Sequence, residues 1–333
     1  MSIPDVPKAE LHVHLEGTAP PALIRRLAQR NGMHVPEGVF KTDDEFAWTD
    51  FLHFLRTYDL AASVIRTPED YRDVTFEYLS RCAGEGAVYV ELIASPDHAA
   101  AVGLGDADHY AGIAQGIDDA RAAHGIDARI IIVAIRDFGA ARAEEIARRH
   151  AEDRHPYVVG FNLAGDEAGY PAALFAGAYA IAAGSGLGCS VHAGEHAGPE
   201  SVRAALELPV TRISHGVRAI EDPALVQVLA ERGVVLEVCP SSNVALGLYP
   251  SYEDHPLGAL RAAGVRVTLG SDDPPYFGCS IGAEYALAHE RMGLEEGDLL
   301  DITRIAVQAS FADDALKRPI LDQLSDVGGR ASH

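Results

Sequence analysis

The chain has 333 residues, and its 27 Lys and Arg against 49 Asp and Glu give a formal net charge of −22. A field of that sign repels polyphosphate chains and anionic lipid surfaces, so neither nucleic acid nor a membrane is an expected partner. Hydrophobic residues make up 48% of the chain, a composition that suits a globular protein with a large core.

The N-terminal segment and the cysteines indicate the cellular compartment. The first ten residues, MSIPDVPKAE, show neither the basic nor the apolar part of a secretory signal. The four cysteines are scattered and form no C-x-x-C pair, as in proteins of a reducing environment. We therefore expect a cytoplasmic protein.

Short β-rich runs alternate with helix-forming segments along the whole chain. The segments between them are rich in Ala, Leu, Arg and Glu, and several end in Gly, where a helix stops. The predicted strands are residues 9–15, 87–94, 129–135, 158–165, 188–194, 211–216, 234–240 and 266–272. Eight strands that alternate with helices predict an α/β fold, a (β/α)8 TIM barrel. An open doubly wound sheet is the alternative, but HLEGT after the first strand is not its glycine-rich turn.

The interval between the first two strands, residues 16–86, is longer than one crossover helix. It predicts extra helices over the C-terminal mouth of the barrel, including residues 50–65. Phe51, Leu52, Phe54 and Leu55 form an apolar cluster at helical spacing there. The cluster is compatible with the core of a helix or with a lid over a substrate.

The first strand carries two histidines, His12 and His14, in the stretch KAELHVHLEGT. Side chains two positions apart on a strand face the same way, so both imidazoles can aim at one point. The pair alone is equally compatible with two core histidines bonded to backbone. Other polar residues stand at or just beyond the ends of later strands, where barrel enzymes build their active sites. These are His192, Glu195, His215, Asp272, Asp273 and the segment LAGDE at 163–167.

Four of these side chains make a plausible ligand set for a metal ion. His12, His14 and His192 offer three imidazoles and Asp272 a carboxylate, which suits zinc and is compatible with iron, cobalt or nickel. A bound metal lowers the pKa of water towards neutrality and supplies a nucleophile without Ser or Cys. We therefore expect residues 1–333 to form a single metal-dependent hydrolase domain.

Other residues near the predicted ligands acquire roles in the same chemistry. Burial in a partly desolvated mouth is expected to raise the pKa of Glu195 and make it a proton donor. His215 is expected to hydrogen-bond the attacking water and stabilise its charge. The chain turns after Asp273 and can present its carboxyl group to a substrate. Gly165 lacks a side chain, so a ligand can approach the backbone N–H there.

The set of motifs resembles the adenosine deaminase family of the amidohydrolase superfamily, in the same order and over most of the chain. The motifs are PKAELHVHLEG, LAGDE, VHAGE, RISHG, VCPSSN and SDDPPYFG. The resemblance implies hydrolytic deamination at C6 of a purine nucleoside. The expected reaction converts adenosine or 2′-deoxyadenosine and water to inosine and ammonia, with one zinc ion per chain.

Carried over by position, the resemblance implies a role for each residue of the site. Glu195 protonates N1 of the purine, while His215 and Asp272 orient the nucleophile. Asp273 bonds to N7 and the Gly165 N–H to N3. The remaining assignments are the zinc ligands His12, His14, His192 and Asp272, the sugar contact Glu16, and the apolar gate Phe51, Leu52 and Leu55.

Some positions depart from the family pattern on the sugar side. Glu16 stands where many adenosine deaminases have Asp, and Glu is common there among adenine deaminases, whereas LAGDE is of the nucleoside type. Ser214 and Asn162 replace the usual Gly and Asp. A modified nucleoside such as aminodeoxyfutalosine, or free adenine, therefore remains an alternative substrate.

Two rival functions fit the sequence less well than deamination. Other metal hydrolases on the same barrel often hold two metals bridged by a lysine after the fourth strand, and VVGFNLAG contains no lysine, which favours a single metal. A non-catalytic nucleoside-binding barrel would have lost a metal ligand or the acid, whereas the four predicted ligands and Glu195 are all present. The sequence is compatible with a homo-oligomer and leaves the pathway open.

Overall fold

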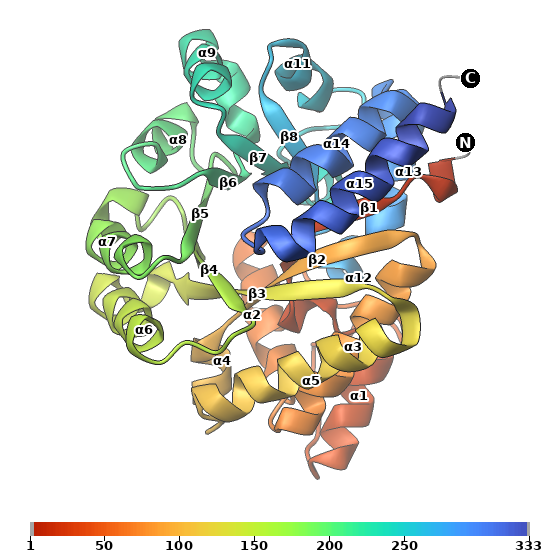
Figure 1. Ribbon diagram of the computed structural model, residues 1–333. Helices are drawn as coiled ribbons and strands as arrows, with labels where there is room; N and C mark the ends of the chain where they lie inside the picture. The colour runs from red at the N-terminus through yellow and green to blue at the C-terminus, as the bar shows by residue number, and fades with distance from the viewer. Residues whose placement is uncertain (1–2, 332–333) are drawn as a thin grey trace.

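The computed structural model describes residues 3–331, in which eight parallel strands form one sheet in the order β1 to β8 (Figure 1). The strands are β1 (Lys8–His14), β2 (Ala87–Ala94), β3 (Asp127–Ile135), β4 (Val158–Ala164), β5 (Gly188–Ala193), β6 (Arg212–His215), β7 (Val235–Val238) and β8 (Arg266–Leu269). A parallel bridge between Val13 and Asp272 joins the chain after β8 back to β1. The predicted (β/α)8 barrel is therefore confirmed.

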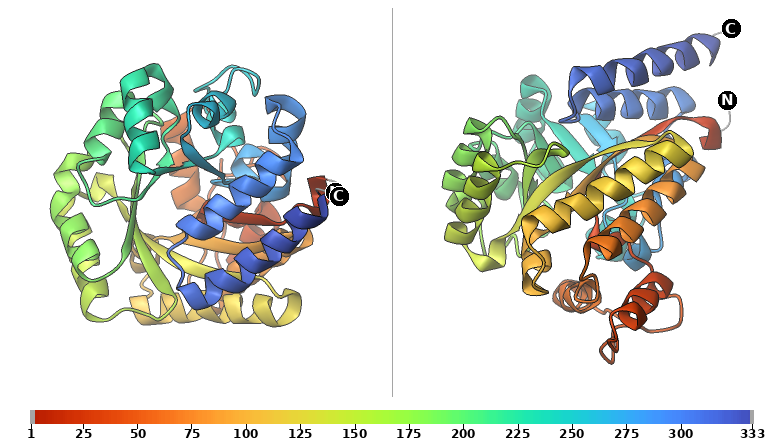
Figure 2. Two further views of the ribbon diagram at one scale, coloured as in Figure 1. Left: turned by 45° about the horizontal axis from the view of Figure 1, so that its top comes forward. Right: turned by 60° about the horizontal axis from the view of Figure 1, so that its bottom comes forward.

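Helices surround the strand ring (Figure 2). They are α1 (Pro21–Arg30), α2 (Phe51–Ala62), α3 (Pro68–Gly84), α4 (Pro96–Ala101), α5 (Asp106–His124), α6 (Ala140–Glu152), α7 (Ala176–Gly184), α8 (Pro199–Ala205), α9 (Pro223–Arg232), α10 (Pro240–Ala245), α11 (Leu257–Ala262), α12 (Pro274–Phe277), α13 (Ile281–Met292), α14 (Glu296–Ala309) and α15 (Asp314–Ala331). Within residues 3–331, the structure contains no helix with the length and apolar character needed to cross a membrane.

Six of the strands end one to three residues earlier than predicted, and three of these are followed directly by a glycine with positive φ, Gly165, Gly194 or Gly216. His215 at the end of β6 and Asp272 after β8 have φ values of +62° and +61°. This left-handed backbone is costly for a residue with a Cβ and is often found at functional sites. Both residues belong to the predicted site.

Three helices, α1 to α3, occupy the interval between β1 and β2. The Asp50 side chain caps α2 by accepting from the N–H of His53, and Thr67 and Asp70 form a capping box at α3. The apolar side of α2 lies over the cavity described below, whereas α3 packs on α5 in the outer ring (Figure 1). Extra helices are therefore present where the sequence predicts them.

The amino ends of the strands are closed by the segment between α14 and α15. Phe311 packs against Gly160 near the start of β4 and against Gly188 at the start of β5, and a Cβ at either glycine would lie 2.6 Å or less from its ring. The Phe311 ring also stacks on the guanidinium of Arg212, 3.6 Å away. This end of the barrel is filled by side chains, which leaves the carboxyl ends of the strands for a ligand.

Candidate active site

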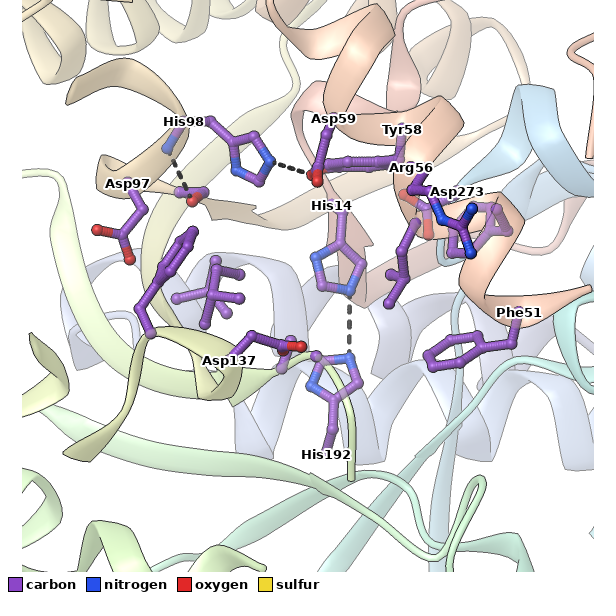
Figure 3. Close-up of a pocket in the computed structure, with 18 of the residues that line it drawn as sticks. His14, Phe51, Arg56, Tyr58, Asp59, Asp97, His98, Asp137, His192 and Asp273 are labelled. Atoms are coloured by element: carbon purple, nitrogen blue, oxygen red, sulfur yellow. Dashed lines mark hydrogen bonds and ion pairs between the residues drawn. The ribbon is translucent and has the colours of Figure 1, made fainter. Parts of the chain in front are cut away.

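The four predicted metal ligands meet at the carboxyl end of the barrel. Nε2 of His12 and Nε2 of His14 each lie 3.4 Å from Oδ1 of Asp272. Nε2 of His14 also faces Nε2 of His192 at 3.2 Å (Figure 3). One donor atom from each of the four residues therefore lies within 4.8 Å of every other.

The groups behind two of these imidazoles determine which nitrogen carries the proton. Nδ1 of His12 lies 3.2 Å from the Glu237 carbonyl oxygen, which can only accept a hydrogen bond. Nδ1 of His192 lies 2.8 Å from Oδ1 of Asn162. In both rings Nδ1 therefore donates, and the lone pair on Nε2 points into the cluster.

The Asn162 amide has a fixed orientation because its NH2 group donates hydrogen bonds to two serine hydroxyls. Its Nδ2 lies 2.7 Å from Oγ of Ser190 and 3.1 Å from Oγ of Ser214. Ser214 donates in turn to Oε2 of Glu237 at 2.7 Å. Asn162 and Ser214, which depart from the family pattern, thus hold His192 in place together.

The cluster fits a divalent cation. Nε2 of His12 is buried and has no hydrogen-bond partner among residues 3–331. Burial lowers the pKa of His14 to about 4, so this imidazole is neutral and can bind a metal. Burial opposes protonation of His12, but the Asp272 carboxylate outweighs it and raises the pKa of His12 to about 9. A cation bound here would take the place of that proton beside Asp272.

Glu195 lies beside the cluster, with Oε1 3.6 Å from Nε2 of His215 and 3.3 Å from Nε2 of His196. The expectation of a raised pKa is wrong for this arrangement. Burial does raise the pKa of Glu195, but the two neighbouring histidines outweigh burial and lower it. His196 was not predicted to contact the Glu195 carboxylate, although it directly follows Glu195 in the sequence.

The loop that carries Glu195 is held by a residue that sequence reasoning overlooked. The Glu167 carboxylate accepts hydrogen bonds from four consecutive backbone N–H groups, those of residues 194–197. Glu167 itself is buried. Glu167 is the last residue of the LAGDE segment, and its place in that motif was the only hint in the sequence that it belongs to the site.

Asp273 follows Asp272 in the chain, is buried, and lines the same cavity as His14 (Figure 3). Burial and the adjacent Asp272 carboxylate raise the pKa of Asp273 well above its usual value. A protonated carboxyl group can donate a hydrogen bond as well as accept one. Gly17 makes room for this side chain, since a Cβ there would lie 1.8 Å from Oδ1 of Asp273.

A cavity of about 590 Å³ opens from the cluster and is lined mainly by apolar groups. That volume falls in the range of small-molecule sites. Phe51, Leu52 and Leu55 of α2 form part of its wall. Gly165 also lines the cavity. Its φ of +106° favours glycine, and a Cβ at this position would lie 2.4 Å from Oδ2 of Asp137.

Glu16 occupies a different place from the other predicted substrate residues. Its carboxylate is buried, accepts from the N–H of Ser95 at 3.1 Å, and lies 3.4 Å from the Tyr71 hydroxyl. Among the described residues, it is not one of those that line the cavity. Tyr58 and Ser95, which do line it, stand around Glu16.

Fold and site together define a barrel hydrolase with a candidate metal centre at the carboxyl ends of its strands. The profile of the family described as Adenosine deaminase matches residues 7–327, and the chain belongs to that family. It is thus an aminohydrolase that acts on the C–N bond of a cyclic amidine in purines.

Several relatives cover nearly the whole chain. An adenine deaminase of Agrobacterium fabrum is 47% identical over 96% of this chain and 98% of its own length, and one of Chelativorans sp. is 48% identical with the same coverage. The crystal structure of adenine deaminase from Arthrobacter aurescens is similar with a TM-score of 0.89 and 32% identity, over 97% of this chain and 99% of that one. An amidohydrolase from Burkholderia ambifaria, with bound Zn, has a TM-score of 0.86 and 27% identity over 98% and 93%.

Proposed function

We propose that the chain deaminates free adenine, converting adenine and water to hypoxanthine and ammonia. The observation that carries the proposal is the similarity to proteins named adenine deaminase, at 45–48% identity over at least 95% of this chain. This similarity supports the alternative of free adenine better than the main expectation of adenosine.

The place of Glu16 gives this preference a physical basis. The residue was expected to contact a sugar, but its carboxylate bonds instead to Ser95 and Tyr71 behind the cavity wall. Burial raises the pKa of Glu16, which disfavours a charged carboxylate that turns towards a ligand. With Glu16 held away from the cavity, the site offers the sugar no hydrogen-bonding partner at this position.

A metal ion belongs to the proposed mechanism. His12, His14, His192 and Asp272 would hold one zinc ion, in agreement with the orphaned Nε2 of His12 and with the ligand types. When bound, such an ion supplies a water molecule of lowered pKa as the nucleophile.

The protein's own side chains then act on the purine ring. Glu195 takes up a proton from the attacking water and delivers it to N1, which makes C6 electrophilic. The remaining proton of that water passes to the amino nitrogen, which leaves C6 as ammonia while the C6 carbonyl forms. Asp273, in its protonated form, donates to N7, and the backbone N–H of Gly165 donates to N3. His215 stabilises the charge that develops on the attacking oxygen.

We further propose that residues 1–333 work as one domain in which segment 16–86 acts as a lid. The apolar side of α2, with Phe51, Leu52 and Leu55, would then shield the purine from bulk water. Phe51 supports this role through its contact with the His196 ring, whose centroid lies 3.7 Å away.

A substrate panel on the zinc-loaded protein tests the proposed function. It compares kcat/KM for adenine, adenosine, 2′-deoxyadenosine, AMP and aminodeoxyfutalosine by ammonia release. We expect adenine to exceed every nucleoside by at least about 100-fold, roughly 2.7 kcal/mol of transition-state stabilisation. A preference for adenosine or for the modified nucleoside would overturn the proposal.

A further inference from the structure

A chain of three hydrogen bonds lies behind His215, on the side away from the metal cluster. The backbone N–H of Leu257 lies 3.2 Å from Nδ1 of His255, and Nε2 of His255 lies 3.1 Å from Oδ1 of Asn243. Nδ2 of Asn243 then lies 3.2 Å from Nδ1 of His215. All three side chains are buried, so water does not compete for these bonds.

The direction of each bond follows from its first member. A backbone N–H can only donate, so Nδ1 of His255 accepts from Leu257. Burial lowers the pKa of His255 to about 3, so its single ring proton is on Nε2 and goes to Asn243. With its oxygen so engaged, the Asn243 amide turns its NH2 group to Nδ1 of His215.

This arrangement is the opposite of the one behind two predicted ligands. A carbonyl oxygen stands behind Nδ1 of His12 and of His192, which leaves a lone pair on Nε2. A donor stands behind Nδ1 of His215. The neutral His215 ring therefore carries its proton on Nε2, which lies 3.6 Å from Oε1 of Glu195 and 3.8 Å from Oδ2 of Asp272.

We propose that His255 is a positioning residue that, through Asn243, fixes His215 as a hydrogen-bond donor at Nε2. His215 is thereby excluded as a further imidazole ligand and as a proton acceptor in its neutral form. It offers an N–H to the attacking oxygen, where negative charge develops. The assignment deepens the proposed function, because it specifies what His215 does in the deamination.

His255 acts from outside the cavity that holds the cluster. It belongs to the wall of a second hollow of about 510 Å³, together with Tyr249 and Tyr252. The Tyr249 ring packs edge-on against His255 at a centroid distance of 5.0 Å, which restricts rotation of the imidazole. The position of this residue, 40 after His215 in the sequence, gives no hint of a link to it.

Nitrogen NMR of the imidazole rings tests the assignment directly. The zinc-loaded, full-length protein is labelled with 15N-histidine, and the His215 signals are assigned by their absence in His215→Asn. We expect Nδ1 of His215 to resonate as a nonprotonated nitrogen and Nε2 as a protonated one. The reverse pattern would overturn the proposal, and this measurement needs no change at position 255 and no substrate.

Two substitutions at position 255 test the positioning role. In His255→Gln the side chain can still accept from Leu257 and donate to Asn243, whereas His255→Leu can do neither. We expect the Leu variant to lose about 10- to 100-fold in kcat, with KM and zinc content little changed. The Gln variant should retain kcat within about threefold.

The outcome of this comparison is decisive in each case. A Leu variant with unchanged kcat, or equal losses in both variants, would show that His255 serves packing alone. The kinetic arm rests on the proposed function, while the NMR arm does not. If the parent protein does not turn over adenine but shows the expected NMR pattern, the proposed substrate is wrong. The assignment of the His215 tautomer would then still hold.

Discussion

At the scale of single residues, the charges around Glu195 bear on its proposed role as the acid. His196 and His215 hold the pKa of Glu195 below its usual value, so the side chain is a carboxylate at neutral pH and must first receive a proton from the attacking water. Glu167 holds the loop that carries Glu195 by accepting hydrogen bonds from four of its backbone N–H groups. The geometry of this acid is thus set by neighbours on both sides.

Replacement of Glu195 by Gln tests the assigned acid. The amide keeps the size of the side chain but cannot deliver a proton to N1, so kcat for adenine should fall by about 10² to 10⁴. Zinc content, measured by elemental analysis, should match that of the parent protein, because Glu195 is not a proposed ligand. A variant that keeps full activity would show that another group is the acid.

Asp273 is expected to bind the purine rather than the metal. In Asp273→Ala the donor to N7 is lost, so KM for adenine should rise by about 10-fold or more, as for one hydrogen bond to a charged or polar group. Zinc affinity, from competition with a chelator, should change much less. Equal losses in both quantities would instead assign Asp273 to the metal.

At the scale of elements, the strands were the most predictable part of the sequence. Buried parallel strands are nearly continuous apolar runs, and all eight stand out between helix-forming segments. The C-terminal helices α13 to α15 and the plug formed by Phe311 were not predicted, because amphipathic periodicity does not say which end of a barrel a helix covers.

The helix α2 allows a matched test of the lid. Leu52 lines the cavity although 53% of it is exposed, and Leu55 lines it as well. Leu52→Ala and Leu55→Ala should each raise KM for adenine about three- to tenfold, since a hydrophobic wall contact of 1 kcal/mol or so is lost. Leu60, 41% exposed on the same helix, is the control and should change nothing when replaced by Ala. Equal effects at the three positions would contradict a lid function.

The contact of α13 with α10 predicts a pH dependence of stability. Burial raises the pKa of Glu284 to about 7, and the backbone N–H of Ser241 lies 3.3 Å from its carboxyl group. The folded chain thus keeps a proton that the unfolded chain releases, so this stabilisation is full below about pH 4.5 and is lost as pH rises through 7. The loss amounts to about 3 kcal/mol.

Urea unfolding of the parent protein and Glu284→Gln at pH 5 and pH 8.5 checks this prediction. The parent protein should lose more free energy of unfolding between the two pH values than the variant, by up to about 3 kcal/mol. The same slope in both proteins would mean that Glu284 does not titrate in this range.

At the scale of the whole molecule, the sequence was sufficient for the barrel and for grouping the four candidate ligands. His12, His14, His192 and Asp272 could be grouped because each stands at the end of a predicted strand. The neighbours that orient the histidines of the site could not be found in this way. Asn162 contacts His192, and His255 in its proposed role reaches His215 through Asn243. Such contacts depend on packing and leave no characteristic spacing in the sequence.

The place of the Glu16 carboxylate could not be derived from the sequence either, for a related reason. Glu16 follows the second histidine and was assigned to a sugar, but the fold turns its carboxylate behind the cavity wall, towards Ser95 and Tyr71. The extra methylene relative to Asp was visible in the sequence. The partners of the longer side chain are Ser95, which follows β2, and Tyr71 in α3, and both lie far along the chain.

Anomalous diffraction at the zinc edge tests the central claim most directly. Crystals of the protein loaded with zinc should show one strong anomalous peak per chain, in contact with the imidazoles of His12, His14 and His192 and the carboxylate of Asp272. A peak that lies elsewhere, or two peaks of similar height at the mouth of the barrel, would contradict the single-metal account.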